Sequence, residues 1–149
     1  MNQVAYSYER GHSARYIFTS VGKRRIEKAV EFVSVGMKNL VKLGFGDLRP
    51  DGSLDDTVHS NNGDIVKVLA TVIAILKEYT AQNPQTEVFF TGSTIERTRL
   101  YTRILTVYYP VFSTDFRIVG ITRTEGKTSR TSFNPASNLE YLAFLIKRI

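Results

Sequence analysis

The stretch Glu87-Val-Phe-Phe-Thr-Gly-Ser-Thr-Ile-Glu-Arg-Thr-Arg-Leu-Tyr-Thr-Arg103 joins a short apolar run to an amphipathic segment through a glycine and two hydroxyl residues. A short apolar run bounded by turn residues is typical of a buried strand, so we predict a strand over 86–91. Ser93 and Glu96 have the spacing of a capping box, in which the serine hydroxyl accepts a hydrogen bond from the Glu96 amide. The apolar residues that follow recur at helical spacing, and Pro110 ends the predicted helix.

The segment before this stretch predicts a longer helix. Its apolar residues occupy one helical face, which neighbouring apolar residues widen, so we expect the helix to be buried on a sheet. Asn61, Asn62 or Asp64 can cap its start, and Asn83-Pro84 ends it. The residues of the apolar face are Ile65, Val68, Leu69, Val72, Leu76 and Tyr79.

Strands are predicted on both sides of these helices. Alternating or apolar runs separated by turn signals predict strands over 4–8, 15–21, 26–33, 39–46, 54–59, 116–122 and 141–149. The polar segment 123–138 is predicted to be a mobile loop. The central strand–helix–strand unit should have a right-handed crossover. We therefore expect a single α+β domain over 1–149, with two main helices on a mostly antiparallel, twisted sheet of about seven strands.

Composition limits the possible functions. The 149 residues include no cysteine, which excludes disulfides, cysteine-ligated zinc and a cysteine nucleophile. The net charge of +6 permits acidic partners, but the positive charges are scattered, which makes nucleic acid an unlikely partner. We see no targeting segment and no apolar run approaching the roughly 20 residues that a membrane span needs, so we expect a cytoplasmic protein with no membrane partner.

The start of the second helix is the candidate binding site. The first amides of a helix lack internal partners and can hold an anion, which nearby guanidinium groups would favour. The alternative interpretation is that Ser93 and Glu96 use these donors as a cap, while Arg99 pairs with Glu96. The candidate residues are Gly92, Ser93, Thr94, Arg97, Arg99 and Arg103.

Two other features offer weaker chemistry. Asp47, Asp51, Asp55 and Asp56 surround one predicted hairpin turn and could approach a hard cation, but their spacing does not match an EF-hand loop. We interpret them as a solvated acidic turn and predict no metal site. The start of the longer helix, at 60–64, is interpreted as an ordinary N-cap, because Asp64 would compete with a bound phosphate.

Two segments carry a resemblance to known sequences. One is Asn61-Asn62-Gly63-Asp64 running into 67–72, and the other is Thr91-Gly92-Ser93-Thr94 running into 97–101. Together they resemble a family of short, uncharacterised bacterial proteins, and the resemblance extends over most of the chain. It implies no particular activity.

The predicted order of strand, long helix, strand, helix, strand and strand resembles the core of the GNAT acyltransferases. The resemblance implies acetyl-CoA as cofactor, with its pyrophosphate at Asn62 and Gly63, and Tyr101 as a general acid. The chain departs from the pattern of that family. It has Thr94 and Arg97 where the family often carries Asn and Ala, and only Gly63 remains of the glycine-rich pyrophosphate loop.

These observations favour a small cytoplasmic domain that binds an acidic or phosphate-bearing ligand or partner at a helix N-terminus and has no assigned catalysis. A GNAT-like acyltransferase that uses acetyl-CoA is the first alternative. A protein-interaction module of a regulatory pair, with its binding surface away from the helix starts, is the second.

Overall fold

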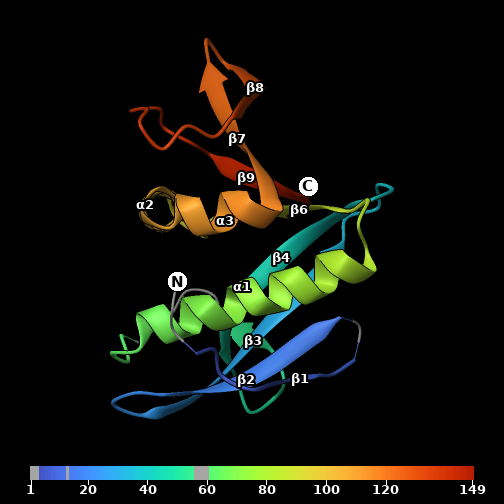
Figure 1. Ribbon diagram of the computed structural model, residues 1–149, viewed down its shortest axis with the longest axis vertical. Helices are drawn as coiled ribbons and strands as arrows, with labels where there is room; N and C mark the ends of the chain where they lie inside the picture. Colours follow the sequence, from blue (N-terminus) through green and yellow to red (C-terminus); the bar gives the residue numbers. More distant parts are fainter. Residues whose placement is uncertain (1–3, 13, 56–60) are drawn as a thin grey trace.

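The first half of the chain forms an antiparallel run of strands in the computed structural model, which describes residues 4–12, 14–55 and 61–149 (Figure 1). Each strand pairs with the next through a short connection. The strands are β1 (Tyr8–Arg10), β2 (Arg15–Val21), β3 (Arg25–Ser34), β4 (Leu40–Leu48) and β5 (Leu54–Asp55).

The second half alternates helices with strands. Helix α1 (Ile65–Gln82) leads into β6 (Glu87–Phe90), and α2 (Ile95–Val107) and α3 (Tyr109–Asp115) lead into the last strands. These are β7 (Phe116–Thr124), β8 (Lys127–Ser132) and β9 (Ala143–Arg148). The strand order is β1-β2-β3-β4-β6-β9-β7-β8, with β5 also on β4, so the last strand inserts between β6 and β7.

All but one of the strand pairs among the described residues are antiparallel. The exception is β4 with β6, which are parallel and share three residue pairs, from Leu40–Glu87 to Lys42–Phe89. The prediction of an α+β fold with a mostly antiparallel sheet is confirmed, although the described chain has nine strands and three helices instead of about seven and two.

The three helices cover the same face of the sheet (Figure 1). On this face Phe32 of β3 stacks on Tyr79 of α1 with ring centroids 3.9 Å apart, and Phe90 of β6 meets Tyr101 of α2 edge-on. Ring contacts continue from Phe90 to Phe144, and a single hydrophobic core contains buried residues of both halves. Side chains that alternate with these residues point to the opposite face, where no helix of the described chain packs.

The prediction of a loop over 123–138 has to be corrected. Residues 127–132 form β8, which pairs with β7 through a two-residue turn. Both turn residues, Glu125 and Gly126, have positive φ angles, of 53° and 76°, as the tight turns of hairpins require. Polar residues on both faces of β8 hid the strand, because an edge strand in water does not need an apolar side.

Two predicted boundaries were also wrong. Pro110 does not end the second helix: α2 already ends at Val107, and Pro110 lies in the first turn of α3, where its missing amide costs nothing. The first strand begins at Tyr8 instead of residue 4, because the Tyr6 amide donates to Thr71 Oγ1 of α1 at 2.8 Å. Most of the predicted strand 54–59 lies outside the described residues.

Candidate functional site

Thr94, and not Ser93, is the N-cap of α2. Its backbone is extended, with φ −136° and ψ 166°, and its Oγ1 accepts a hydrogen bond from the Arg97 amide at 3.2 Å. The predicted capping box of Ser93 and Glu96 was therefore one residue out of register. Glu96 still lies in the first turn, where a carboxylate interacts favourably with the helix dipole.

Gly92 is required here by close packing. A Cβ atom at this position would lie 2.5 Å from the Thr98 nitrogen and 2.6 Å from the Arg97 Cβ. The Gly92 amide donates to Thr98 Oγ1 at 3.1 Å. Thr98 is buried, and its hydroxyl donates in turn to the Thr94 carbonyl at 3.2 Å. The amide of Gly92 is therefore occupied, and this residue shapes the start of α2 without offering a free donor.

The amides of residues 93–96 are the free donors. Among the described residues, none of these four consecutive N–H groups has a hydrogen-bond partner. Two precede the helix and two belong to its first turn, where no intrahelical acceptor exists. Ser93 and Thr94 are exposed, so these donors are accessible to a solute.

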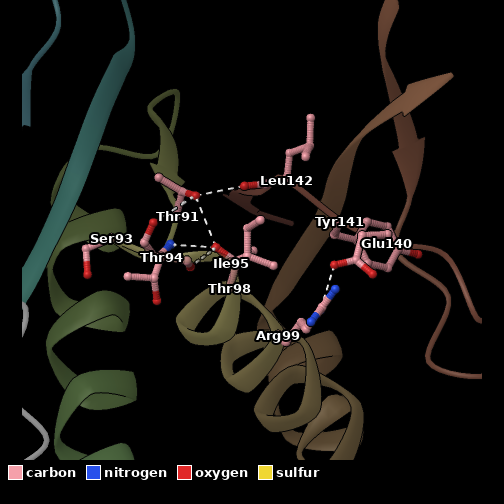
Figure 2. Close-up of a pocket in the computed structure, with 10 residues that line it drawn as sticks. Thr91, Ser93, Thr94, Ile95, Thr98, Arg99, Glu140, Tyr141 and Leu142 are labelled. Carbon is pink, nitrogen blue, oxygen red and sulfur yellow. Dashed lines mark hydrogen bonds and ion pairs between the residues drawn. The ribbon is translucent and has the colours of Figure 1, made fainter. Parts of the chain in front are cut away.

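An open cleft of about 710 Å³ lies at this helix start (Figure 2). One wall is the segment from Thr91 to Ile95 with the first turn of α2, and the other is the segment that leads into β9. Thr91 Oγ1 ties the two walls together by donating to the Leu142 carbonyl at 2.7 Å. The lining residues are Thr91, Gly92, Ser93, Thr94, Ile95, Thr98, Arg99, Glu140, Tyr141 and Leu142.

The charged rim of the cleft is an ion pair. Arg99 Nε donates to Glu140 Oε1 at 2.8 Å, from α2 to the segment before β9 (Figure 2). Both side chains are largely exposed, at 61% and 58%. An apolar part of the cleft is exposed as well, since Ile95 and Leu142 are 63% and 38% accessible.

The structure gathers part of the predicted site. Gly92, Ser93, Thr94 and Arg99 line the cleft, whereas Arg97, Arg103 and Tyr101 are not among its lining residues. Tyr101 is half-buried, and its ring packs edge-on against Phe90. A catalytic role for Tyr101 and a binding role for the other residues stay predictions.

Asn62 and Gly63 lie elsewhere, at the start of α1. The Asn62 side chain is buried and holds the turn between β2 and β3, accepting from the Arg24 amide and donating to the Arg24 carbonyl, both at 2.7 Å. It also donates to Ser20 Oγ at 3.0 Å. Its polar atoms are therefore occupied by the protein, which leaves no side-chain group of Asn62 for a cofactor.

Asp64 forms a second side-chain contact at the start of α1, where it is half-buried. Its carboxylate accepts from Ser20 Oγ at 2.5 Å and from Tyr6 Oη at 2.6 Å. Burial alone would raise the pKa of Asp64, but the hydrogen bonds from Ser20 and Tyr6 outweigh it, so the pKa lies below its ordinary value. Burial and the hydrogen bond to Asp64 raise the pKa of Tyr6. The ionised aspartate is thus part of the fold.

The carboxylates of the predicted acidic turn have separate partners. Asp47 pairs with the buried Lys28, Asp55 with Arg49, and Asp51 accepts from Ser53. Asp56 lies outside the described residues. Within the described ranges, no three carboxylate or imidazole groups are placed to hold a metal ion. No helix there is long and apolar enough to cross a membrane.

Comparison with family models places the chain in a known group. A model described as "Family of unknown function (DUF6934)" matches residues 2–149. The chain belongs to this family. No curated protein and no solved structure matches it. Membership confirms the resemblance to an uncharacterised family, and it assigns no activity to the cleft.

The sequence did not reveal the second wall of the cleft. Glu140 and Leu142 follow a polar segment and carry no motif, and they reach α2 only because β9 inserts beside β6. Thr98 was also missed, although a hydroxyl one turn into a helix that follows a glycine is a usable signal for a capping contact.

Proposed function

We propose that the cleft at the start of α2 binds an acidic or phosphate-bearing ligand. The observation that carries the proposal is the run of four amides at 93–96 that borders the cleft and has no hydrogen-bond partner in the part of the chain that the structure describes. Consecutive free N–H groups at a helix start attract carboxylate or phosphate oxygens through hydrogen bonds and the helix dipole. The cleft gives such a ligand room beyond its anionic group.

The Arg99–Glu140 pair supports the same proposal. Exposed ion pairs contribute only about 0–1 kcal/mol, so an incoming anion can replace Glu140 at Arg99 at little cost. The side chain of Glu140 then acts as an internal competitor for the guanidinium group. Ile95 and Leu142 offer apolar contact next to the amides, which favours an anion attached to an apolar group.

Titration of inorganic phosphate, pyrophosphate and acetate at constant ionic strength tests this proposal by thermal shift and by amide chemical shifts. We expect amide shifts at 93–96, tighter binding by Glu140→Gln and weaker binding by Arg99→Gln, each by several-fold. Arg123→Gln, at an exposed residue near the end of β7, is the matched control and should bind like the wild type. Equal affinities in all four proteins would contradict the proposal.

Acyl transfer from acetyl-CoA is the second candidate, favoured by the order of elements. The chain runs from β4 through α1 to the parallel β6, then through α2 to β7, with the last strand inserted between β6 and β7. Helix α3 and strand β8 are additions to the GNAT-like pattern. A thermal shift with CoA and acetyl-CoA at millimolar concentration tests this candidate, and no stabilisation would count against it.

A further inference from the structure

We propose that the helix-free face of the sheet binds an amphipathic helix with acidic flanks from another protein. The proposal concerns a surface separate from the cleft and does not depend on the cleft binding anything. The surface, called the basic face, consists of Val33, Lys42, Phe89, Arg117, Val119 and Lys147.

Strand register places these side chains on one face. Val33 lies opposite Lys42, Lys42 opposite Phe89, Phe89 opposite Leu145, and Leu145 opposite Val119. Directly opposite residues project from the same side of a sheet, so they form a row across five strands. Phe32, the chain neighbour of Val33, stacks on α1, so this row projects from the face without helices.

The charges on the basic face are not explained by folding. Arg117 and Lys147 are direct partners on β7 and β9, and like charges in that position destabilise a sheet. Within the described residues, neither they nor Lys42 forms an ion pair or a side-chain hydrogen bond. Glu87, next to Lys147, already pairs with Arg130 at 3.3 Å. The three cations therefore leave an excess of positive charge.

Apolar groups lie between these cations. Val33 is 50% exposed although it lies on an inner strand, and Phe89 and Val119 are half-buried, whereas Leu145 between them is buried at 4%. The other face of the same sheet is covered by three helices that pack on such rows (Figure 1). A partner helix with an apolar stripe would bury Val33, Phe89 and Val119. Acidic residues beside the stripe would form ion pairs with the three cations.

A second copy of the chain fits less well. A two-fold contact through this face would place the same three cations of both copies in one interface, where like charges repel. Nucleic acid would pair with the cations but would leave the apolar side chains in contact with a polar backbone. The combination of charge and apolar exposure therefore selects an acidic, amphipathic protein segment.

The probe is a synthetic helical peptide with leucine on one side and glutamate elsewhere. Its binding is measured by the changes it causes in the amide and methyl chemical shifts of the full chain. We expect shifts at Val33, Lys42, Phe89 and Val119. The triple variant Lys42→Glu, Arg117→Glu, Lys147→Glu should weaken binding by at least about tenfold. The charge-matched variant Lys23→Glu, Arg103→Glu, Lys127→Glu, with exposed residues outside the basic face, should bind like the wild type.

Three results of the peptide titrations would overturn the proposal. These are equal binding by the two triple variants, equal binding of a peptide with lysine in place of glutamate, and shifts confined to residues outside the basic face. Tighter binding of a single-stranded oligonucleotide than of the acidic peptide would also overturn it, because the partner would then be of another class. Circular dichroism of both variants shows whether they keep the wild-type fold.

Discussion

Gly92 shows how a single residue shapes the start of α2. Its missing side chain lets the chain approach the first helical turn, and a Cβ atom would lie 2.5 to 2.7 Å from atoms of Arg97 and Thr98. We expect Gly92→Ala to cost about 1–3 kcal/mol in the free energy of unfolding, because such overpacking forces the backbone to shift. Urea denaturation measures this change.

The matched control is Gly11→Ala. At Gly11 the nearest atoms would lie 3.6 and 3.9 Å from an added Cβ, an ordinary van der Waals separation. This variant should be about as stable as the wild type. If Gly92→Ala proved equally neutral, the close packing at the start of α2 would not be a constraint on this position.

Residue-level signals predicted the start of α2 only approximately. The sequence offers two neighbouring hydroxyls, Ser93 and Thr94, and the glutamate at 96 made the first of them the better predicted cap. The structure selects Thr94 because Thr98 then satisfies the Gly92 amide one turn later. The choice of Thr94 as the cap depends on packing between two segments, so it cannot be predicted from the spacing of the hydroxyl residues alone.

At the scale of elements, Asn62 joins the start of α1 to the turn between β2 and β3. We expect Asn62→Ala to destabilise the protein by about 2–3 kcal/mol, because it removes the three hydrogen bonds that the buried side chain makes with the Arg24 amide, the Arg24 carbonyl and Ser20 Oγ. Thermal or urea unfolding measures the loss. Gln85→Ala, at an exposed residue, is the control. Equal stability of the two variants would show that the junction does not depend on this side chain.

The same junction predicts a pH dependence. Because the folded pKa of Asp64 lies below its ordinary value, its contribution to stability is present above the unfolded pKa of about 3.9. The contribution is lost as the pH falls through the lower folded pKa. Urea unfolding of the wild type and Asp64→Asn, from about pH 7 to about pH 3, should show a stability difference that shrinks only at the acidic end. A difference that stays constant with pH would contradict this role.

Helix α1 and the inner strands could be predicted from sequence because their apolar residues follow one clear period. Strand β8 could not, since its residues are polar on both sides and its existence depends on the turn at Glu125 and Gly126. Helix α3 was missed because Pro110 signals both an end and a beginning.

At the scale of the whole molecule, the insertion of β9 between β6 and β7 creates the cleft. This pairing brings Glu140 and Leu142 beside α2, more than forty positions away from Arg99 in the chain. No local sequence pattern predicts such a pairing of distant strands, so the sequence could identify one wall of the cleft and not the other. Both crossovers, from β4 to β6 and from β6 to β7, run in the same direction across the sheet, so the helices of the described chain lie on one face.

Main-chain amides at the start of α2 are proposed to bind an anion. Ile95→Pro removes one of these amides at the first helical position, where proline is tolerated, and the extended Thr94 before it suits a following proline. Ile95→Ala removes most of the side chain and keeps the amide. In calorimetric titrations with pyrophosphate, we expect Ile95→Pro to weaken binding by about tenfold and Ile95→Ala to bind like the wild type. Equal affinity of the two variants would contradict the account.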